Sequence, residues 1–170
     1  ENISREVSDI YHCAAIVNMV APYKKLKTVN VGGTKEVVKL ALTRVKKKIN
    51  YVSTLSVFVA TERNTGVALE HDNLSKTKTV YGGYAQSKRV AERFLQQIPN
   101  RALGINIFRF GLITGDSQTG IYSPHDYLDM FIRGVVSLGV IPGGGHRAIS
   151  LDVTPVDYAA KTMVYISSKS

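Results

Sequence analysis

The chain has 170 residues, 44% of them apolar, and its 22 lysine and arginine residues against 13 aspartate and glutamate residues give a net charge of +9. This length suffices for one ordinary hydrophobic core. No apolar run approaches the roughly 18 residues of a membrane-spanning helix, so the sequence predicts no membrane partner.

The single cysteine, Cys13, excludes an internal disulfide bond and favours a reducing, cytoplasmic location. The positive charge suits phosphate-bearing ligands or an acidic partner. The run from Lys46 to Lys48 lacks the interleaved aromatic residues that a nucleic-acid site would prefer. We interpret this run as the exposed last turn of a helix, where cations meet the helix dipole favourably, and we expect no nucleic-acid partner.

The first half of the chain alternates between predicted strands and helices. Residues 7–15 predict a buried strand that ends in small side chains, which let a ligand approach the backbone. Residues 23–48 predict a long helix. Gly32 and Gly33 either break this helix or allow it to pack closely against a neighbouring element. Residues 49–58 predict a second strand, and residues 61–79 predict a polar loop.

The second half continues the alternation. Residues 84–97 predict a helix, residues 104–115 a third strand, and residues 126–138 another helix. Thr154–Asp157 indicates the start of a last helix that runs to Ile166. Strands and helices at this spacing predict an α/β fold in which right-handed crossovers connect the strands of a parallel sheet.

One pair of residues in the second predicted helix has the spacing of a catalytic site. Tyr84 and Lys88 lie four residues apart and therefore share a helix face. An ammonium group beside a phenol lowers the phenol pKa, which suits proton transfer near neutral pH. The same spacing is also common on ordinary surface helices. The preceding strand places the hydroxyls of Thr54 and Ser56 near its end, at the sheet edge where ligands bind.

Six segments of the chain, in this order, resemble motifs of the extended short-chain dehydrogenase/reductase family. They are Asp9-x-x-His12-x-Ala14-Ala15, Asn30-Val31-x-Gly33-Thr34, Ser53-Thr54-x-x-Val57, Tyr84-x-x-x-Lys88, Arg109-x-Gly111-x-Ile113-x-Gly115 and Thr154-Pro155-Val156-Asp157. Within that family, the sequences of residues 11–15, 30–34 and 51–58 are similar to those of the thioester reductase branch. This branch comprises the terminal reductase domains of nonribosomal peptide and polyketide synthases.

This resemblance implies a Rossmann-like, doubly wound parallel sheet. Residues 1–115 would be the C-terminal portion of an NADP-binding domain, with strands four to six, and residues 116–170 a partial substrate-binding subdomain. The implied reaction is the NADPH-dependent reduction of an acyl or peptidyl thioester to an aldehyde, or onward to an alcohol. The implied partner is a carrier protein that bears the substrate on a phosphopantetheine arm.

The resemblance also implies the roles of individual residues. Thr54 and Tyr84 would hydrogen-bond the developing oxyanion, with Tyr84 as proton donor, while Lys88 would lower the Tyr84 pKa and hold the nicotinamide ribose. Ser56 is the alternative to Thr54 as the catalytic hydroxyl, and the register of the Ser53-Thr54-x-x-Val57 motif favours Thr54. The residues expected to line the cofactor are His12, Ala14, Ala15, Asn30, Lys88, Gly111, Leu112 and Ile113. His125 and His146 have no partner at metal-ligand spacing, so no metal site is predicted.

The family's Gly-x-x-Gly-x-x-Gly loop, which binds the cofactor pyrophosphate, is absent from these residues. We therefore expect the chain to be part of a larger domain, to expose a sheet edge and to be inactive alone. Two other functions remain open. One is a nucleotide-sugar epimerase or dehydratase of the same superfamily. The other is a non-catalytic scaffold, against which the intact Thr54, Tyr84 and Lys88 set argues.

Overall fold

The computed structural model describes residues 3–59, 68–72, 74, 80–124, 126–141 and 151–170. The chain divides into two compact units, Glu1–Arg109 and Phe110–Ser170. Most of the predicted loop 61–79, and both His125 and His146, lie outside the described residues. The domain boundary expected after residue 115 stays a prediction about the whole protein.

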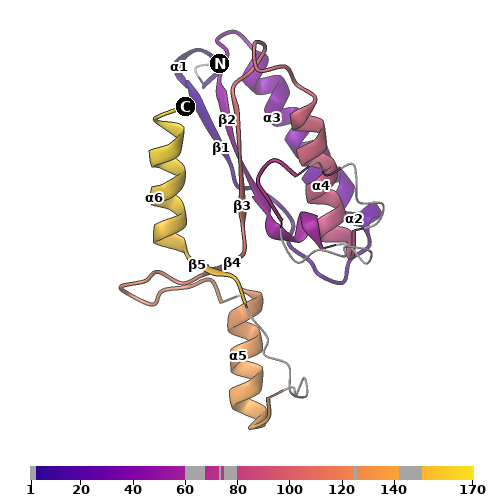
Figure 1. The fold of residues 1–170 in the computed structure, drawn as a ribbon, viewed down its shortest axis with the longest axis vertical. Coiled ribbons are helices and arrows are strands. Elements are labelled where there is room, and N and C mark those ends of the chain that lie inside the picture. The colour runs from indigo at the N-terminus through magenta and orange to yellow at the C-terminus, as the bar shows by residue number, and fades with distance from the viewer. Residues whose placement is uncertain (1–2, 60–67, 73, 75–79, 125, 142–150) are drawn as a thin grey trace. The chain divides into compact units, whose positions relative to one another are not determined.

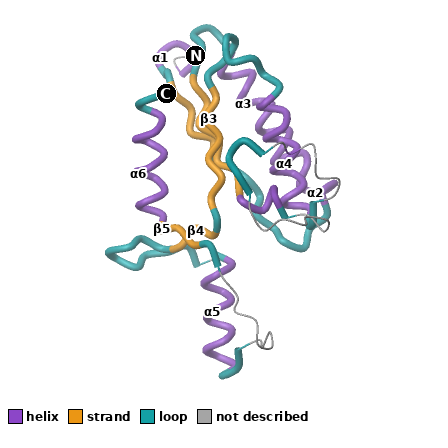
Figure 2. Tube along the Cα trace, viewed as in Figure 1, coloured by secondary structure: helices purple, strands orange, loops and turns teal. Residues whose placement is uncertain are grey.

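The first unit is built on a three-stranded sheet (Figure 2). Its order is β1 (Asp9–His12), β2 (Lys48–Thr54) and β3 (Ile105–Phe110). β1 pairs parallel with β2, from Asp9 opposite Lys48 to His12 opposite Tyr51. Most of β2 is buried, as expected of a central strand rich in apolar and β-branched residues. These strands confirm the predicted α/β fold with parallel pairing.

Helices α2, α3 and α4 gather beside this sheet (Figure 1). The helical elements of the unit are α1 (Ile3–Glu6), α2 (Tyr23–Lys27), a π-helical turn (Thr28–Gly32), α3 (Gly33–Leu42), a 3-10 turn (Leu55–Phe58) and α4 (Gly83–Gln96). The predicted helix over residues 23–48 was wrong in its extent. It contains a π turn just before Gly33 and ends at Leu42, because Thr43 is extended and Arg44 has a positive φ of 63°.

The interpretation of Lys46–Lys48 as an exposed helix end was also wrong. Lys48 starts β2, and Lys47 is only 1% exposed. The Lys47 ammonium donates hydrogen bonds to the backbone carbonyls of Ser4, Thr43 and Val45 at 2.9, 3.0 and 2.6 Å. It therefore satisfies two carbonyl groups just beyond the end of α3 and one in α1, from inside the protein and not from solvent.

The core of the first unit lies between the sheet and helices α3 and α4. Its buried members are Val31, Val38, Ala41, Ile49, Tyr51, Ala91, Leu95 and Leu103. Leu95, late in α4, shares this cluster with Ile49 at the start of β2, while Lys88 reaches Val52 nearer the end of the strand. Helix α4 therefore runs back along β2, and its N-terminal turn lies at the carboxyl end of that strand.

The second unit contains a short parallel pair, β4 (Leu112–Thr114) with β5 (Val153–Pro155), and two helices, α5 (Tyr127–Leu138) and α6 (Val156–Ser167). The predicted strand 104–115 is thus divided at Gly111, where a side chain would lie 2.5 Å from the Asp152 carbonyl oxygen. Asp126 caps α5, and Gly139, with φ of 65°, ends it. In the described residues, no helix has both the length and the apolar character needed to cross a bilayer.

Candidate active site

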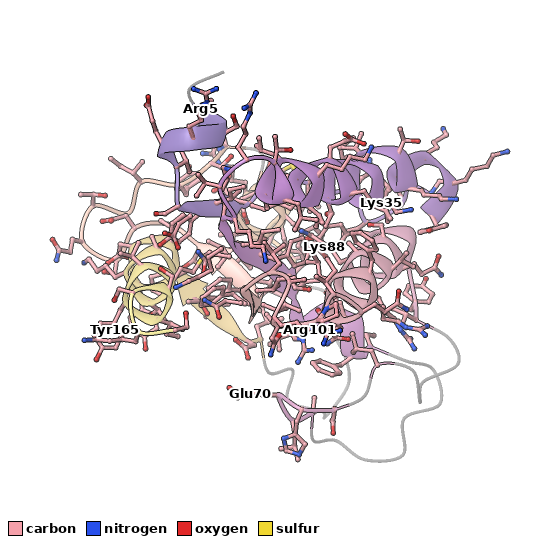
Figure 3. All side chains as sticks on the ribbon, turned by 90° about the horizontal axis from the view of Figure 1, so that it is seen from above. Arg5, Lys35, Glu70, Lys88, Arg101 and Tyr165 are labelled. Carbon is pink, nitrogen blue, oxygen red and sulfur yellow. The ribbon has the colours of Figure 1, made fainter. Side chains whose placement is uncertain are left out.

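Helix α4 carries Lys88 into the interior of the first unit. The side chain is 2% exposed, and Figure 3 shows Lys88 among densely packed side chains, whereas Lys35 lies on the exposed side of α3. The Lys88 ammonium donates to the Val52 carbonyl at 2.8 Å and lies 4.8 Å from the centre of the Tyr51 ring. Burial lowers the pKa of Lys88 to about 8. This lysine therefore titrates close to physiological pH.

Tyr84 lies one turn before Lys88, in the first turn of α4, and is half-buried. Its hydroxyl makes no hydrogen bond to the residues that the structure describes. Burial raises the pKa of Tyr84, which corrects the expectation that Lys88 lowers it. The physical reason is desolvation, which penalises a phenolate in the interior. The Lys88 ammonium is directed to the Val52 carbonyl and the Tyr51 ring.

Thr54 is the last residue of β2 and is buried. Its Oγ1 accepts a hydrogen bond from the Ser56 backbone N–H at 3.2 Å and lies 3.2 Å from the Ser56 hydroxyl. Because α4 runs back along β2, one helical turn of about 5.4 Å beyond Lys88 brings Tyr84 level with this strand end. The three predicted catalytic residues thus occupy one edge of the sheet, with Thr54 and Ser56 both still candidates for the hydroxyl.

His12 and Asn30 are buried and committed to protein contacts. His12 Nε2 lies 3.1 Å from the Thr34 hydroxyl, and burial, with a smaller effect of Lys88, lowers the His12 pKa. The Asn30 amide accepts from the Ile16 N–H at 2.8 Å and donates to the Ile16 carbonyl at 3.1 Å and the Ser87 hydroxyl at 2.9 Å. Asn30 therefore fastens the segment that follows β1 to helix α4.

Ala14 and Ala15 lie in that fastened segment, directly after β1. Ala14 is exposed and Ala15 is half-buried. Their small side chains leave the backbone at the end of the strand accessible, as the sequence predicts for a ligand-binding edge. Their contact with a cofactor stays a prediction.

Gly111, Leu112 and Ile113 belong to the second unit, so the described geometry does not join them to the residues above. All three are half-buried at β4. A cavity of about 620 Å³ lies within this unit, between β4, the loop after it, α5 and the start of α6. Its apolar walls include Ile113, Ile121, Leu128, Ile132 and Val156.

Sequence reasoning missed a buried ion pair beside the site. Glu92 is fully buried, accepts from the Ser53 hydroxyl at 2.7 Å and pairs with Arg109, whose Nε lies 2.8 Å from Glu92 Oε1. Tyr84, Lys88 and Glu92 follow one another at intervals of four on a single helix stripe. The available signal was the spacing of Glu92, which lies four residues after Lys88 on the helix face of the predicted catalytic pair.

The donor groups at the sheet edge fit a nicotinamide cofactor. An ammonium carries three protons, and within the described residues Lys88 commits one, to Val52, which leaves two for ribose hydroxyls. The Tyr84 hydroxyl is likewise uncommitted there. Among the described side chains, no three histidine, cysteine or acidic residues cluster as metal ligands would.

The sequence matches the family model described as Male sterility protein, an NAD-binding family, over residues 1–163. It is 37% identical over 166 residues to a linear gramicidin synthase of Brevibacillus parabrevis, a match covering 97% of this chain and 3% of that protein. It is 32% identical over 172 residues to glycine betaine reductase ATRR of Emericella nidulans, covering 100% of this chain and 13% of that protein.

A solved structure, the terminal R domain from the myxalamid PKS-NRPS biosynthetic pathway, resembles the chain with a TM-score of 0.85 and 38% identity. The match covers 98% of this chain and 41% of that domain. The chain therefore spans a small part of its curated relatives and less than half of this solved relative.

Proposed function

Because the chain belongs to the male sterility protein family, in the thioester reductase branch of the extended short-chain dehydrogenases/reductases, we propose that it carries the catalytic residues of an NADPH-dependent reductase. The substrate is an acyl or peptidyl thioester on the phosphopantetheine arm of a carrier protein. The product is an aldehyde, or an alcohol after a second reduction. The carrier thiol is released when the aldehyde forms.

The observation that carries this proposal is the buried Lys88 ammonium, which lies on α4 one helical turn after Tyr84, at the edge of a parallel sheet. Lys88 would hold the nicotinamide ribose. Bound NADPH supplies the hydride. As the thioester carbonyl gains charge, the hydroxyls of Thr54 and Tyr84 would donate hydrogen bonds to its oxygen.

Tyr84 would also give its proton to that oxygen. The raised pKa of Tyr84 keeps the phenol protonated at neutral pH, which is the state that this role needs. The backbone near Ala14 and Ala15, and residues Gly111 to Ile113, would line the cofactor. His12 and Asn30 would support the cofactor segment through the contacts described above.

The cavity of the second unit supports an acyl chain as the substrate moiety. Its size lies within the range of small-molecule sites, roughly 300–1,000 Å³. Three carboxylates also line it, but each has a partner. Asp116 accepts from Thr119, Asp126 accepts from the Leu128 N–H, and Asp129 pairs with Arg133. The apolar walls therefore remain as the surface for a ligand, and we propose that an uncharged chain binds there.

The test is oxidation of NADPH, with NADH as comparison, by the full-length protein and an acyl-pantetheine thioester. We expect Tyr84→Phe to reduce kcat by about 10²–10⁴-fold. Tyr81→Phe, three residues earlier and 75% exposed, is the matched control and should retain full activity. Wild-type activity that survives Tyr84→Phe would contradict the assigned role, and turnover of nucleotide sugars in place of thioesters would favour an epimerase or dehydratase.

The net charge of +9 supports docking of an acidic carrier protein. We expect KM for the carrier-bound substrate to rise with ionic strength, because salt screens attraction between exposed charges. KM for a free pantetheine thioester should change little over the same range. Equal salt dependence of the two substrates would argue against a charge-driven carrier site.

A further inference from the structure

Tyr51, in the middle of β2, makes the closest ring contact of the Lys88 ammonium in the described residues. Its side chain is 1% exposed, and its ring centre lies 4.8 Å from Lys88 Nζ. A second neighbour is the His12 ring, at 5.5 Å between centroids and tilted by 50°. The Tyr51 ring therefore has both a buried ammonium and a buried imidazole as neighbours.

The hydroxyl of Tyr51 does not account for a tyrosine at this position. It lies toward Thr34 but forms no well-aligned hydrogen bond within the described residues. The Thr34 hydroxyl donates to the Asn30 carbonyl at 2.7 Å and meets His12 Nε2. The ring is thus the part of Tyr51 that lies near the Lys88 ammonium.

We propose that Tyr51 is a positioning residue for Lys88: the face of its ring holds the ammonium against the Val52 carbonyl and keeps it charged. This inference rests on the proposed function, in which the charged lysine holds the cofactor ribose. The ring of a tyrosine attracts a cation within about 6 Å of its centroid, and more strongly where water is excluded. With Lys88 at 2% exposure, the contact is almost fully desolvated.

The remaining ionisable groups around Lys88 set the sign of the expected effect. Burial has the largest effect and opposes the charged lysine, whereas Cys13 after β1 and Glu92 on α4 favour it. His12 on β1 is kept neutral by its lowered pKa, and Tyr84 on α4 by its raised one, so neither adds charge at neutral pH. Removing the ring then removes an attraction that opposes desolvation, and the pKa of Lys88 should fall below about 8.

The test compares Tyr51→Phe, which keeps the ring, with Tyr51→Leu, which removes it, in the full-length protein. Lys88 is charged below its pKa, so activity should decline on the alkaline side of the profile of kcat/KM against pH. We expect Tyr51→Leu to shift this decline about one pH unit lower, and Tyr51→Phe to leave it in place. Equal shifts in both variants, or none in Tyr51→Leu, would overturn the proposal.

A merely structural role for Tyr51 predicts a different result. Leu95→Ala weakens the same core cluster without touching Lys88, so it should lower the unfolding temperature and leave the pH profile unchanged. If Tyr51→Leu does not fold, Tyr51→Met, which fills more of the space, replaces it.

A readout without turnover separates this proposal from the proposed function. Titration of the Lys88 side-chain nitrogen by NMR should give a lower pKa in Tyr51→Leu than in Tyr51→Phe, even if no thioester is reduced. Absence of activity in the wild type, with this pKa difference present, would reject the reductase and keep the contact. Wild-type activity with no pKa difference between the two variants would support the reductase and reject the role of Tyr51.

Discussion

The two units of the chain treat polar groups in opposite ways. In residues 1–109, several charged side chains are buried and have defined partners, as Lys47, Lys88 and Glu92 show. In residues 110–170, the only buried side chains among those described are Ala159, Met163 and Ser167, and α5 buries none. The charged pairs of this unit, such as Lys161 with Asp157, lie at its surface.

This difference separates two tasks. Desolvated charges have shifted pKa values and rigid positions, which suits the chemistry of a reaction. Apolar surface around a cavity suits the binding of a substrate whose identity varies. Substitutions in the first unit should therefore alter stability and protonation, and substitutions in the second should alter what binds. Five predictions test this contrast, from the largest expected effect to the smallest.

Glu92→Ala should destabilise the first unit by about 3–5 kcal/mol, because it removes the buried carboxylate that pairs with the Arg109 guanidinium. Glu36→Ala is the matched control, since it breaks the exposed pair with Lys39 and should cost no more than about 1 kcal/mol. Urea unfolding measures both. Equal losses would show that burial does not distinguish the two pairs.

Lys88→Met should stabilise the folded protein by about 1–2 kcal/mol while removing the proposed activity. The pKa of Lys88 is lowered to about 8, so below that pH its charge is less favourable in the folded than in the unfolded state. The lost hydrogen bond to Val52 offsets part of the gain. A fall in the unfolding temperature at pH 7 would contradict this account.

Two glycine substitutions should have opposite signs. In Gly83→Ala the new Cβ would lie 2.3 Å from the Ala21 carbonyl oxygen, a backbone atom, so we expect a loss of about 1–3 kcal/mol. Gly134→Ala, within α5, meets no atom within 4 Å and should gain about 0.5–1 kcal/mol. Thermal unfolding of both variants checks the signs. A loss of stability in both variants would contradict the expected difference between the units.

Leu128→Trp should raise KM for long acyl thioesters about tenfold, because the larger ring fills the apolar cavity of the second unit. Short acyl chains should be affected less, and the free energy of unfolding should barely change. Val136→Trp, on the same helix and 75% exposed, is the control and should leave KM unaltered. A uniform effect on chains of all lengths would remove the cavity from substrate selection.

The smallest effect concerns pH. Burial lowers the folded-state pKa of His12, so the unfolded chain binds the proton more readily. The stability that His12 contributes is present above pH 6.5 and is lost as the pH falls below that value towards the lower folded-state pKa. His12→Gln should flatten this dependence between about pH 7 and 5, as unfolding at a series of pH values would reveal. If the slope of stability against pH is unchanged in His12→Gln, the pH dependence arises from other groups.

Several structural features followed from sequence patterns alone. The alternation of apolar strands with amphipathic helices predicted the α/β fold, because periodicity reports directly which face of an element is buried. The helices at residues 84–97 and 126–138 agree with α4 and α5 within two residues. The spacing of Tyr84 and Lys88 placed both on one face of α4, since helical geometry is local.

Other features depended on contacts between distant segments. The helix predicted to continue to residue 48 stops at Leu42, and Lys47 turns inward to carbonyls of Ser4 and Thr43. No local pattern distinguishes a buried lysine from an exposed one. The same holds for Tyr84, whose pKa is raised by burial, because burial depends on segments that are distant in the sequence. The contacts of Lys88 with Val52 and Tyr51 are likewise made with a different element.

The sequence by itself determined the alternation of strands and helices in residues 1–110, the family and the residue types at the candidate site, because these depend on local spacing and on the residues of each motif. The tertiary structure alone decided which polar groups lose water and which partners they meet. It buried Lys88 against Tyr51, committed Asn30 to Ile16 and paired Glu92 with Arg109. Desolvation and long-range contacts set protonation, and both exist only once the chain has folded.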